Sequence, residues 1–454
     1  MLGKNQVLPL TCERLGAELE GICRHEGQAV FVTGALPGEV IAAKVVQARS
    51  QYAFARVMDV LRASPDRREP FCPVYAQCGG CSGQHMTYEA TLTAKRMQVV
   101  DCLTRIGGLP MTEADVPPVM GALEPLHCRN KTSLPVGGTA KAPMVGFYKR
   151  RSHDIVSIAD CPIAMGDLRA VIAAVRRWMV QLGVEPYQEL TQRGLLRHVI
   201  LRTVRSGETM VLLVATSESL PDTESLILDL QAGVKGFCSL YVSENRMNSN
   251  VILGKTCKRL YGEEIILETL LGLSFEISPL SFFQVNPAQT ERLYRQAIDF
   301  AKLAPGDTVV DAYAGAGTIA LCMAGQCKRV IGLEIVPQAV ESAKRNAKRN
   351  GITNAEFHVA SVEEKLPELI AQGLRPNVVM LDPPRKGVEP SVIEAIGAAA
   401  PRRVVYVSCH VPTQARDAAM LAAYGYRVVG CQPVDMFCYA SGVENILVME
   451  RDPS

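Results

Sequence analysis

The stretch TVVDAYAGAGTIALCMAG, residues 308–325, decides the fold of this chain. An apolar run is followed by a glycine-rich turn and then by a second apolar segment, which is the order of a strand, a tight turn and the first turns of a helix. Gly315 and Gly317 would let the backbone approach a ligand where a side chain would block it. Paired glycines occur at this place in many α/β folds, so the turn alone does not identify the ligand.

The next apolar run, RVIGLEIV (329–336), narrows the choice of ligand. Its Glu334 follows Gly315 by 19 residues (334 − 315), about where an acidic side chain would hold the hydroxyls of a ribose. A dinucleotide-binding turn carries a third glycine, and Ala320 stands at that place here. The pattern therefore favours S-adenosylmethionine over a dinucleotide.

Further apolar runs alternate with helical segments such as PQAVESAKRNAKRNG (337–351), which has one charged face and stops at a glycine. The runs are AEFHVAS (355–361), NVVMLDPP (377–384), VVYVSC (404–409), RVVGCQPV (427–434) and NILVMER (445–451). Strands that alternate with helices predict a mostly parallel, doubly wound sheet. Residues 271–454 are thus predicted to form a Rossmann-like, seven-stranded methyltransferase domain.

Two motifs carry the expected chemistry. Cys409 lies at the end of an apolar run, 27 residues after Asp382 (409 − 382), and such strand ends open onto the ligand crevice of an α/β sheet. Asp382 begins the tetrapeptide DPPR, which is similar to the D-P-P-Y motif of amino-directed nucleic-acid methyltransferases. The aromatic residue that would stack on a flipped base is replaced by Arg385. A carbon acceptor is therefore a better prediction than an exocyclic amine.

Carbon 5 of a pyrimidine becomes nucleophilic only after a group adds to carbon 6, and a cysteine thiolate suits that addition. Cys409 is the predicted nucleophile. Glu444, just before the last apolar run, is the predicted base that removes the carbon 5 proton. The alternative for Cys409 taken alone is a buried thiol that only packs in the core.

At this point the chain resembles the RlmD/TrmA family of RNA (uracil-5-)-methyltransferases over nearly its whole length. The motifs that carry the resemblance are SFFQVN (281–286), DAYAGAG (311–317), GLEIV (332–336), LDPPRKG (381–387), VSCHVPTQARD (407–417) and GVEN (442–445). The resemblance implies that Gln284, Tyr313, Glu334 and Asp382 surround S-adenosylmethionine. It also implies that Cys409 is the nucleophile and Glu444 the base.

The chain departs from the family pattern beside both catalytic positions. His410 and Val411 follow the nucleophile where the family usually has Asn-Pro, and MFCYASGVE (436–444) replaces a histidine-rich segment before the base. These changes flank the catalytic residues without replacing them, so they bear on rate or substrate fit more than on the type of reaction.

A second constellation is formed by cysteines. Cys72, Cys78 and Cys81 have the spacing C-x5-C-x2-C, and Cys161, followed by Pro162, is a distant fourth. Four thiolates hold either zinc or an iron–sulfur cluster, and the three-plus-one spacing favours 4Fe–4S over zinc or unrelated thiols. It also resembles the cluster motif of RlmD-type enzymes. Because this methyl transfer needs no electron, the expected role of the cluster is structural.

Two more domains are predicted before the methyltransferase domain. Short alternating runs in residues 1–61 predict a five-stranded barrel of the oligonucleotide-binding type, which resembles a TRAM domain; the alternative is a barrel that only packs against its neighbours. Residues 62–270 are expected to form a central α+β domain that carries the four-cysteine site. Its basic residues, interleaved with Phe147 and Tyr148, indicate an RNA-binding surface, or else a solvated charged face. These basic residues are Arg129, Lys131, Lys149, Arg150 and Arg151.

Composition agrees with a multidomain globular protein. The chain has 454 residues, 48% of them hydrophobic, and a net charge of only +2, so RNA affinity must come from local patches. The other eleven of its 15 cysteines show no ligand spacing. Without an apolar signal core or membrane-length apolar stretch, we expect a cytoplasmic protein with reduced thiols, no membrane association and no obligate protein partner.

The predicted function is transfer of a methyl group from S-adenosylmethionine to C5 of a uridine in RNA. Within the family, RlmD-type enzymes have both the barrel and the cluster, which favours 23S rRNA as substrate. The alternative substrate is a uridine in the T-loop of tRNA. From other classes, a non-catalytic RNA-binding factor and a small-molecule C-methyltransferase are weaker alternatives.

Overall fold

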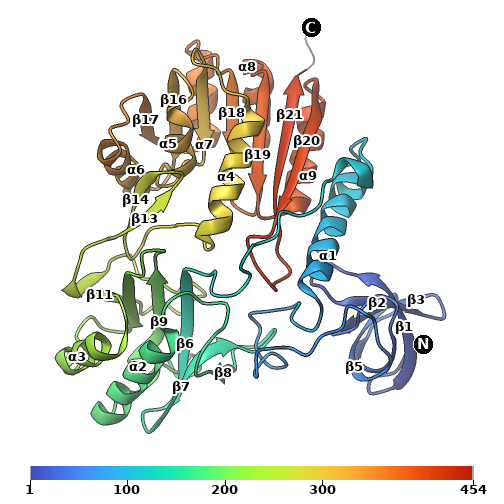
Figure 1. The fold of residues 1–454 in the computed structure, drawn as a ribbon, viewed down its shortest axis with the longest axis vertical. Coiled ribbons are helices and arrows are strands. Elements are labelled where there is room, and N and C mark those ends of the chain that lie inside the picture. The colour runs from blue at the N-terminus through green and yellow to red at the C-terminus, as the bar shows by residue number, and fades with distance from the viewer. Residues whose placement is uncertain (1, 452–454) are drawn as a thin grey trace.

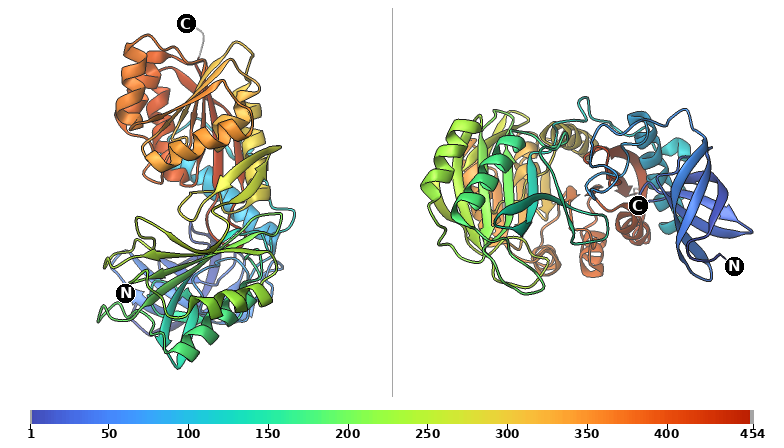
Figure 2. Two further views of the ribbon diagram at one scale, coloured as in Figure 1. Left: turned by 90° about the vertical axis from the view of Figure 1, so that its left-hand side faces the viewer. Right: turned by 90° about the horizontal axis from the view of Figure 1, so that it is seen from below.

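The computed structural model describes residues 2–451, which form three bodies, and a helix lies between the first and the last of them (Figure 1). A barrel at the N-terminus lies beside a central sheet, and a large sheet covered by helices on both faces lies at the opposite end of the molecule (Figures 1 and 2). Within residues 2–451, no helix is both long enough and apolar enough to cross a membrane.

The N-terminal body is a closed five-stranded barrel, as predicted, with its strands in the order β1-β2-β3-β5-β4. Side chains alternate between the barrel interior and its surface. Val30 and Val32 point into the core, and Phe31 between them points outward. The strands are β1 (Val7–Leu15), β2 (Gly21–His25), β3 (Gln28–Thr33), β4 (Val40–Ala48) and β5 (Tyr52–Arg62).

A cysteine-rich loop leads from the barrel into helix α1 (Tyr88–Asp101), whose N-cap Thr87 accepts a hydrogen bond from Ala90 N at 3.2 Å. A π-helical turn η1 (Cys102–Ile106) and a 3₁₀ turn η2 (Glu113–Asp115) follow. Apolar side chains of α1 and η1, such as Val99 and Leu103, are buried in the core of the C-terminal sheet. This segment therefore fastens the barrel to the C-terminal body.

The central body is a seven-stranded sheet in the order β12-β11-β10-β9-β6-β7-β8. Two helices, α2 (Leu168–Leu182) and α3 (Thr223–Gly233), share a buried core with it that includes Trp178. The strands are β6 (Lys131–Thr139), β7 (Ala142–Tyr148), β8 (Ile155–Ser157), β9 (Leu196–Thr203), β10 (Thr209–Ala215), β11 (Phe237–Glu244) and β12 (Lys258–Gly262).

The C-terminal body confirms the predicted seven-stranded sheet, with strand order β17-β16-β15-β18-β19-β21-β20. The first five strands in this order are parallel, and β21 is antiparallel to both its neighbours. The strands are β15 (Thr308–Ala312), β16 (Arg329–Glu334), β17 (Ala355–Val359), β18 (Val378–Leu381), β19 (Arg403–Ser408), β20 (Tyr426–Val434) and β21 (Glu444–Arg451). A hairpin, β13 (Ile266–Leu270) and β14 (Leu273–Ile277), precedes them.

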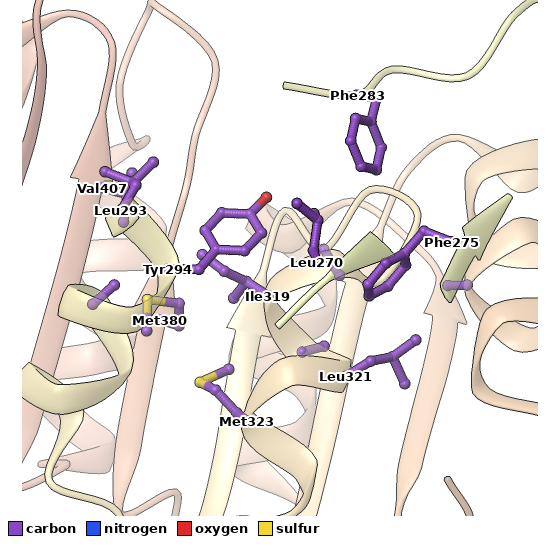
Figure 3. Close-up of a cluster of buried hydrophobic side chains, with 14 of the residues drawn as sticks. Leu270, Phe275, Phe283, Leu293, Tyr294, Ile319, Leu321, Met323, Met380 and Val407 are labelled. Carbon is purple, nitrogen blue, oxygen red and sulfur yellow. The ribbon is translucent and has the colours of Figure 1, made fainter. Parts of the chain in front are cut away.

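Helices cover both faces of this sheet because its strands are apolar on both sides. Val309 of β15 packs into one core and Val310 into the other. The first core includes α4 (Pro287–Ala301), α5 (Thr318–Ala324) and α6 (Pro337–Arg349), and Figure 3 shows part of it. The second includes α7 (Val362–Ala371), α8 (Pro390–Ala399) and α9 (Val411–Ala422).

Candidate active site

The predicted site residues meet at one edge of the C-terminal sheet. Glu334 ends β16, Tyr313 follows β15, Asp382 follows β18 and Cys409 follows β19. Because these strands are parallel, their carboxyl ends lie along the same edge, and the order reverses at β15, between β16 and β18. Ligands of open α/β sheets bind at such a switch point.

The glycine turn after β15 forms one side of this site. Gly315 N donates to Glu334 Oε2 at 3.0 Å, and Val336 N donates to the other carboxylate oxygen at 2.8 Å. A Cβ built on Gly315 would meet open space, so a ligand has access to the backbone there. Gly317 has φ +78°, and a Cβ on it would lie 2.9 Å from the ring of Phe357. That position therefore requires glycine both for its backbone conformation and for its packing.

Acidic side chains line the same place. Asp311 is buried, and its Oδ2 has no hydrogen-bond partner among residues 2–451. Burial, with Asp382 and Glu334 nearby, raises the Asp311 pKa well above its ordinary value. Burial also raises the pKa of Asp382 to about 7. Buried acidic side chains suit a ligand with positive charge, and S-adenosylmethionine carries a sulfonium and an ammonium group.

Gln284 lies in the loop before α4 and is only 9% exposed. Its carbonyl accepts a hydrogen bond from Asn130 Nδ2 at 3.0 Å, so the residue just before β6 of the central sheet helps to hold this loop. Phe282, two residues earlier, is 75% exposed beside that ordered segment. The sequence analysis predicted no role for Phe282, although this residue belongs to a pair of aromatic residues directly before Gln284.

The nucleophile and base predicted from the sequence face each other across two antiparallel strands. Ser408 pairs with Asn445 at the end of the β19–β21 ladder, so Cys409, which follows β19, and Glu444, the first residue of β21, come next to this pair. Glu444 is 2% exposed, and its Oε2 has no hydrogen-bond partner among residues 2–451. Burial, assisted by the nearby Asp382, raises the Glu444 pKa to about 8. A carboxyl group with such a pKa can exchange protons near neutral pH.

Arg385 is a site residue that sequence reasoning left without a role. Burial raises the pKa of the Cys409 thiol, as do Glu444 and Asp382, whereas a hydrogen bond and the positive charge of Arg385 lower it. Arg385 also lowers the pKa of Glu444. In the sequence, Arg385 could have been noticed as a cation four residues after the end of a strand, Leu381, at the sheet edge that also carries Cys409.

Two buried amides hold the strand ends that carry these groups. Gln414 Nε2 donates to the carbonyls of Tyr406 at 2.7 Å and Asn445 at 3.0 Å, and Asn445 Nδ2 donates to Gln414 Oε1 at 2.7 Å. All are fully buried. Hydrogen bonds between the VPTQARD and GVEN motifs thus fix the spacing of β19 and β21.

Hydrogen bonds hold both segments that depart from the family pattern. His410 N donates to Ser408 Oγ at 3.1 Å, and its ring nitrogen Nδ1 lies 3.1 Å from Thr413 Oγ1. Burial and nearby arginines lower the His410 pKa, so its ring is neutral near pH 7. The carbonyl of Tyr439 accepts hydrogen bonds from Ser82 N at 2.7 Å and Gly83 N at 2.9 Å. The segment before Glu444 is thereby attached to the cysteine-rich loop.

The four cysteines with cluster spacing line one cavity of about 390 Å³. Cys128 and Cys438 line it as well, together with Phe437 of the segment before Glu444. Among residues 2–451, no three ligand side chains are close enough together to hold a single metal ion.

Several of the basic residues that were expected to face RNA contact other groups of the protein. Arg150 donates to the carbonyl of Cys81 and lies over the ring of Tyr75. Lys149 pairs with Asp154 at 3.2 Å, and Lys131 lines the cysteine cavity. Burial lowers the Lys131 pKa to about 8. The set is therefore neither a simple solvated face nor a continuous basic patch.

Comparison with known proteins agrees with this site. Residues 263–452 match the family described as tRNA (Uracil-5-)-methyltransferase, and residues 3–58 match the TRAM domain. RNA methyltransferases of Halalkalibacterium halodurans and Clostridium acetobutylicum are 43% and 40% identical to this chain, each over 99% of it and 98% of the relative. The crystal structure of the Pyrococcus abyssi tRNA (uracil-54, C5)-methyltransferase with S-adenosyl-L-homocysteine has a TM-score of 0.78 and 27% identity. It covers 97% of this chain and all of that one.

Fold and site together define an S-adenosylmethionine-dependent methyltransferase that acts on RNA. The chain belongs to the TrmA/RlmD-type family of RNA (uracil-5-)-methyltransferases and carries an N-terminal TRAM domain.

Proposed function

We propose that this enzyme methylates C5 of uridine in 23S rRNA through a covalent adduct between Cys409 and C6 of the base. The observation that carries the proposal is the β19–β21 register, which sets Cys409 opposite Glu444 beside Arg385. A small-molecule methyltransferase would have little use for the N-terminal barrel.

In the proposed reaction, the Cys409 thiolate forms a bond from Sγ to C6, and the electrons of the C5–C6 double bond move into an enolate. Arg385 favours the thiolate because its positive charge lowers the Cys409 pKa. S-adenosylmethionine supplies the methyl group to C5. The carboxylate form of Glu444 then takes the C5 proton, the C5–C6 double bond returns, and the thiolate leaves as the C6–S bond breaks.

Other residues are proposed to hold the methyl donor. Glu334 would accept hydrogen bonds from the ribose hydroxyls, and Tyr313 and Gln284 would line the pocket. Asp382 would face the positively charged end of the donor, where its pKa of about 7 would fall beside a cation. We further propose that Phe282 stacks on a base of the RNA near the target, since its ring is exposed and lies two residues before Gln284.

Cys72, Cys78, Cys81 and Cys161 are proposed to hold a 4Fe–4S cluster in the cavity that they line. Such a cluster would crosslink the loop before α1 to the loop after β8. Since Ser82 and Gly83 bind the carbonyl of Tyr439, its role would be to support the segment before Glu444. Loss of iron should therefore lower the melting temperature. A Cys81→Ala variant should have the same lowered melting temperature, and it should lack the visible absorbance of the cluster.

The domain boundaries that we propose are 1–61 for the barrel, 62–270 for the central domain and 271–454 for the methyltransferase domain. Residues of α1 and η1 pack into the C-terminal core, so the central domain would not separate cleanly at its N-terminal side. We also place the enzyme in the cytoplasm, where its cysteines would stay reduced.

A tRNA uridine is the second candidate substrate, and a specific observation favours it. The Pyrococcus abyssi structure that matches nearly the whole chain is of a tRNA (uracil-54, C5)-methyltransferase. The 23S rRNA proposal depends on the barrel together with the cluster cysteines, a combination that resembles RlmD-type enzymes.

The decisive experiment gives anaerobically purified enzyme radiolabelled S-adenosylmethionine with unmodified 23S rRNA and, separately, unmodified tRNA. Each RNA is then digested and assayed for 5-methyluridine. We expect label in 23S rRNA only. Label only in tRNA would move the enzyme to the second candidate, and binding of both RNAs without label would identify a non-catalytic RNA-binding factor.

A further inference from the structure

The loop that carries Arg385 runs from Asp382, directly after β18, to Glu389, directly before α8. It turns tightly, because Gly387 has φ +80° and its N–H donates to the carbonyl of Pro384 at 2.9 Å. Several backbone groups of the loop bond to side chains of helix α9. The position of Arg385 therefore depends on a helix that lies outside the loop.

Two side chains of α9 donate hydrogen bonds to carbonyl groups of this loop. Thr413 Oγ1 donates to the carbonyl of Arg385 at 3.2 Å. Arg416 Nη2 donates to the carbonyls of Lys386 at 3.1 Å and Val388 at 3.5 Å. The helix therefore holds the loop through its carbonyl groups, beginning at Arg385 itself.

A third side chain of α9, Asp417, is fully buried and is central to these contacts. Its Oδ2 accepts hydrogen bonds from Val388 N at 2.8 Å and from the Tyr406 hydroxyl at 2.7 Å. Its Oδ1 accepts one from Arg416 Nε at 2.8 Å. A buried carboxylate needs hydrogen-bond donors and a positive charge to offset its lost hydration. Here these donors come from the loop, from β19 and from the arginine that holds the loop.

The backbone of the loop packs directly against this ion pair. A Cβ built on Gly387 would lie 2.5 Å from Asp417 Oδ2 and 2.7 Å from Arg416 Nη2. The ion pair itself is close, with Arg416 Nη2 and Asp417 Oδ1 2.6 Å apart. Because Arg385 lies only two residues before Gly387, a change in the ion pair should displace the backbone that carries Arg385.

The placement of Arg385 matters because this residue acts on the Cys409 thiol. Burial raises the pKa of Cys409, and the carboxyl groups of Glu444 and Asp382 raise it further. A hydrogen bond and the positive charge of Arg385 oppose this increase. Hydrogen bonds weaken steeply when their geometry is disturbed. A displaced loop would therefore leave less of Cys409 as thiolate.

We propose that Asp417 is a positioning residue that sets the Arg385 guanidinium against the Cys409 thiol by fixing the loop between β18 and α8. The proposal rests on the proposed function, because it concerns the nucleophile of that reaction. Asp417 acts through Val388 and Arg416 rather than on the substrate. The motif VSCHVPTQARD (407–417) thus contains the nucleophile and, at its last position, the residue that arranges its cationic neighbour.

The test measures alkylation of Cys409 by iodoacetamide in the full-length enzyme, without RNA or S-adenosylmethionine, over a series of pH values. Mass spectrometry of the peptide that contains Cys409 separates this thiol from the other cysteines. Only the thiolate reacts, so each unit of increase in the thiol pKa lowers the rate about tenfold at a pH below it. At about pH 8, we expect Asp417→Asn to react roughly three to ten times more slowly than wild type, with its pH profile displaced upward.

The matched control is Asp307→Asn. Asp307 is also a buried carboxylate paired with an arginine, since its Oδ2 lies 2.6 Å from Arg402 Nη2. It directly precedes β15, so it lies at the amino end of the parallel strands, opposite the edge that carries Cys409. The control should lose stability in chemical denaturation but keep the wild-type alkylation profile. Equal slowing in both variants would mean that any loss of stability exposes this effect, and it would overturn the positioning role.

A double variant tests whether Asp417 acts through Arg385. Arg385→Met/Asp417→Asn should react as slowly as Arg385→Met alone, because the guanidinium that Asp417 positions is already absent. Additive losses would show that Asp417 affects Cys409 by another route and would overturn the proposal. If Asp417→Asn does not fold, Arg416→Gln decides the matter. The Arg416 side chain is half-exposed, and its loss should slow alkylation in the same direction.

A wild-type alkylation profile in the folded Asp417→Asn variant, or in Arg416→Gln where that variant must replace it, would also overturn the proposal. That result is distinct from failure of the proposed function. In the latter case, alkylation of Cys409 would still depend on Arg385 and Asp417, but the wild-type enzyme would leave every RNA unmethylated.

Discussion

At the scale of single residues, the proposed reaction depends on two ionisable groups, Cys409 and Glu444. Burial raises the pKa of both, that of Glu444 to about 8, and the positive charge of Arg385 opposes the increase at each. A pair of groups with displaced pKa values is typical of sites that divide nucleophilic and base roles.

Glu444→Gln should trap the covalent RNA adduct. Glutamine cannot take the C5 proton, so the step that releases Cys409 would be blocked after the methyl group has moved. Denaturing gels should show an RNA–protein band that is stronger than in wild type, and Cys409→Ala should show none while it still binds S-adenosylmethionine in calorimetry. Equal adduct in Glu444→Gln and wild type would mean that another group is the base.

The raised pKa of Glu444 also predicts how stability depends on pH. Between 4.5, its ordinary value, and about 8, the folded protein holds a proton that the unfolded chain releases. The free energy of unfolding should therefore fall as pH rises through this window. Urea titrations at a series of pH values should show this slope in the ligand-free enzyme and a smaller slope in Glu444→Gln. An identical slope in the two proteins would contradict the assignment.

Arg385→Met should move the pH dependence of kcat/KM. Without the cation, the Cys409 pKa rises, so the pH at which activity appears should shift upward by roughly one unit. Arg385→Lys keeps the charge and should keep most of the profile. An unshifted profile in Arg385→Met, with reduced kcat, would show that Arg385 contacts the RNA rather than the thiol.

At the scale of elements, the turn from β15 into α5 is fixed by packing as well as by backbone conformation. Gly317→Ala should destabilise the protein by about 2 kcal/mol, because the left-handed conformation alone costs about 1–2 kcal/mol and the Cβ would also press on Phe357. The control is Gly325→Ala at the other end of α5, where a Cβ meets open space at φ −68°. Chemical denaturation of both variants compares them. Equal stabilities would show that the turn tolerates a side chain.

The alternation of strands and helices after residue 300 was predictable because buried parallel strands are continuous apolar runs between turn residues. The barrel strands were equally visible through alternation of apolar and polar residues. The π-helical turn at Cys102–Ile106 was not predictable, because its residues do not differ in composition from an α-helix.

At the scale of the whole molecule, a buried ion pair joins helix α1 to the segment before Glu444. Lys95 and Asp435 are both fully buried, with Nζ and Oδ1 2.5 Å apart, and Lys95 also donates to the carbonyl of Phe437 at 2.9 Å. Tyr88 donates to the other oxygen of Asp435 at 2.7 Å. The contact spans 340 residues of sequence, so it ties the N-terminal half to the catalytic half.

Lys95→Met should cost about 3–5 kcal/mol, because it leaves the Asp435 carboxylate buried without its cation. Lys95→Met/Asp435→Leu should recover much of this loss. The control, Lys365→Met, removes an exposed pair with Glu368 and should change the free energy of unfolding by less than about 1 kcal/mol. Denaturant midpoints measure all three, and a double variant no more stable than the single one would show that the ion pair itself stabilises the fold.

The sequence by itself determined the three bodies, the methyl donor and the enzyme class, because each depends on local signals: apolar periodicity, a glycine turn, and the motifs that follow the strands. Only the tertiary structure placed Arg385 beside Cys409, paired Gln414 with Asn445 and brought the aromatic rings of β3 and β5 together. It also decided that Arg150 and Arg151 contact protein groups as well as solvent. The physical reason is that these contacts depend on strand order and register, which are set by packing between segments far apart in the chain.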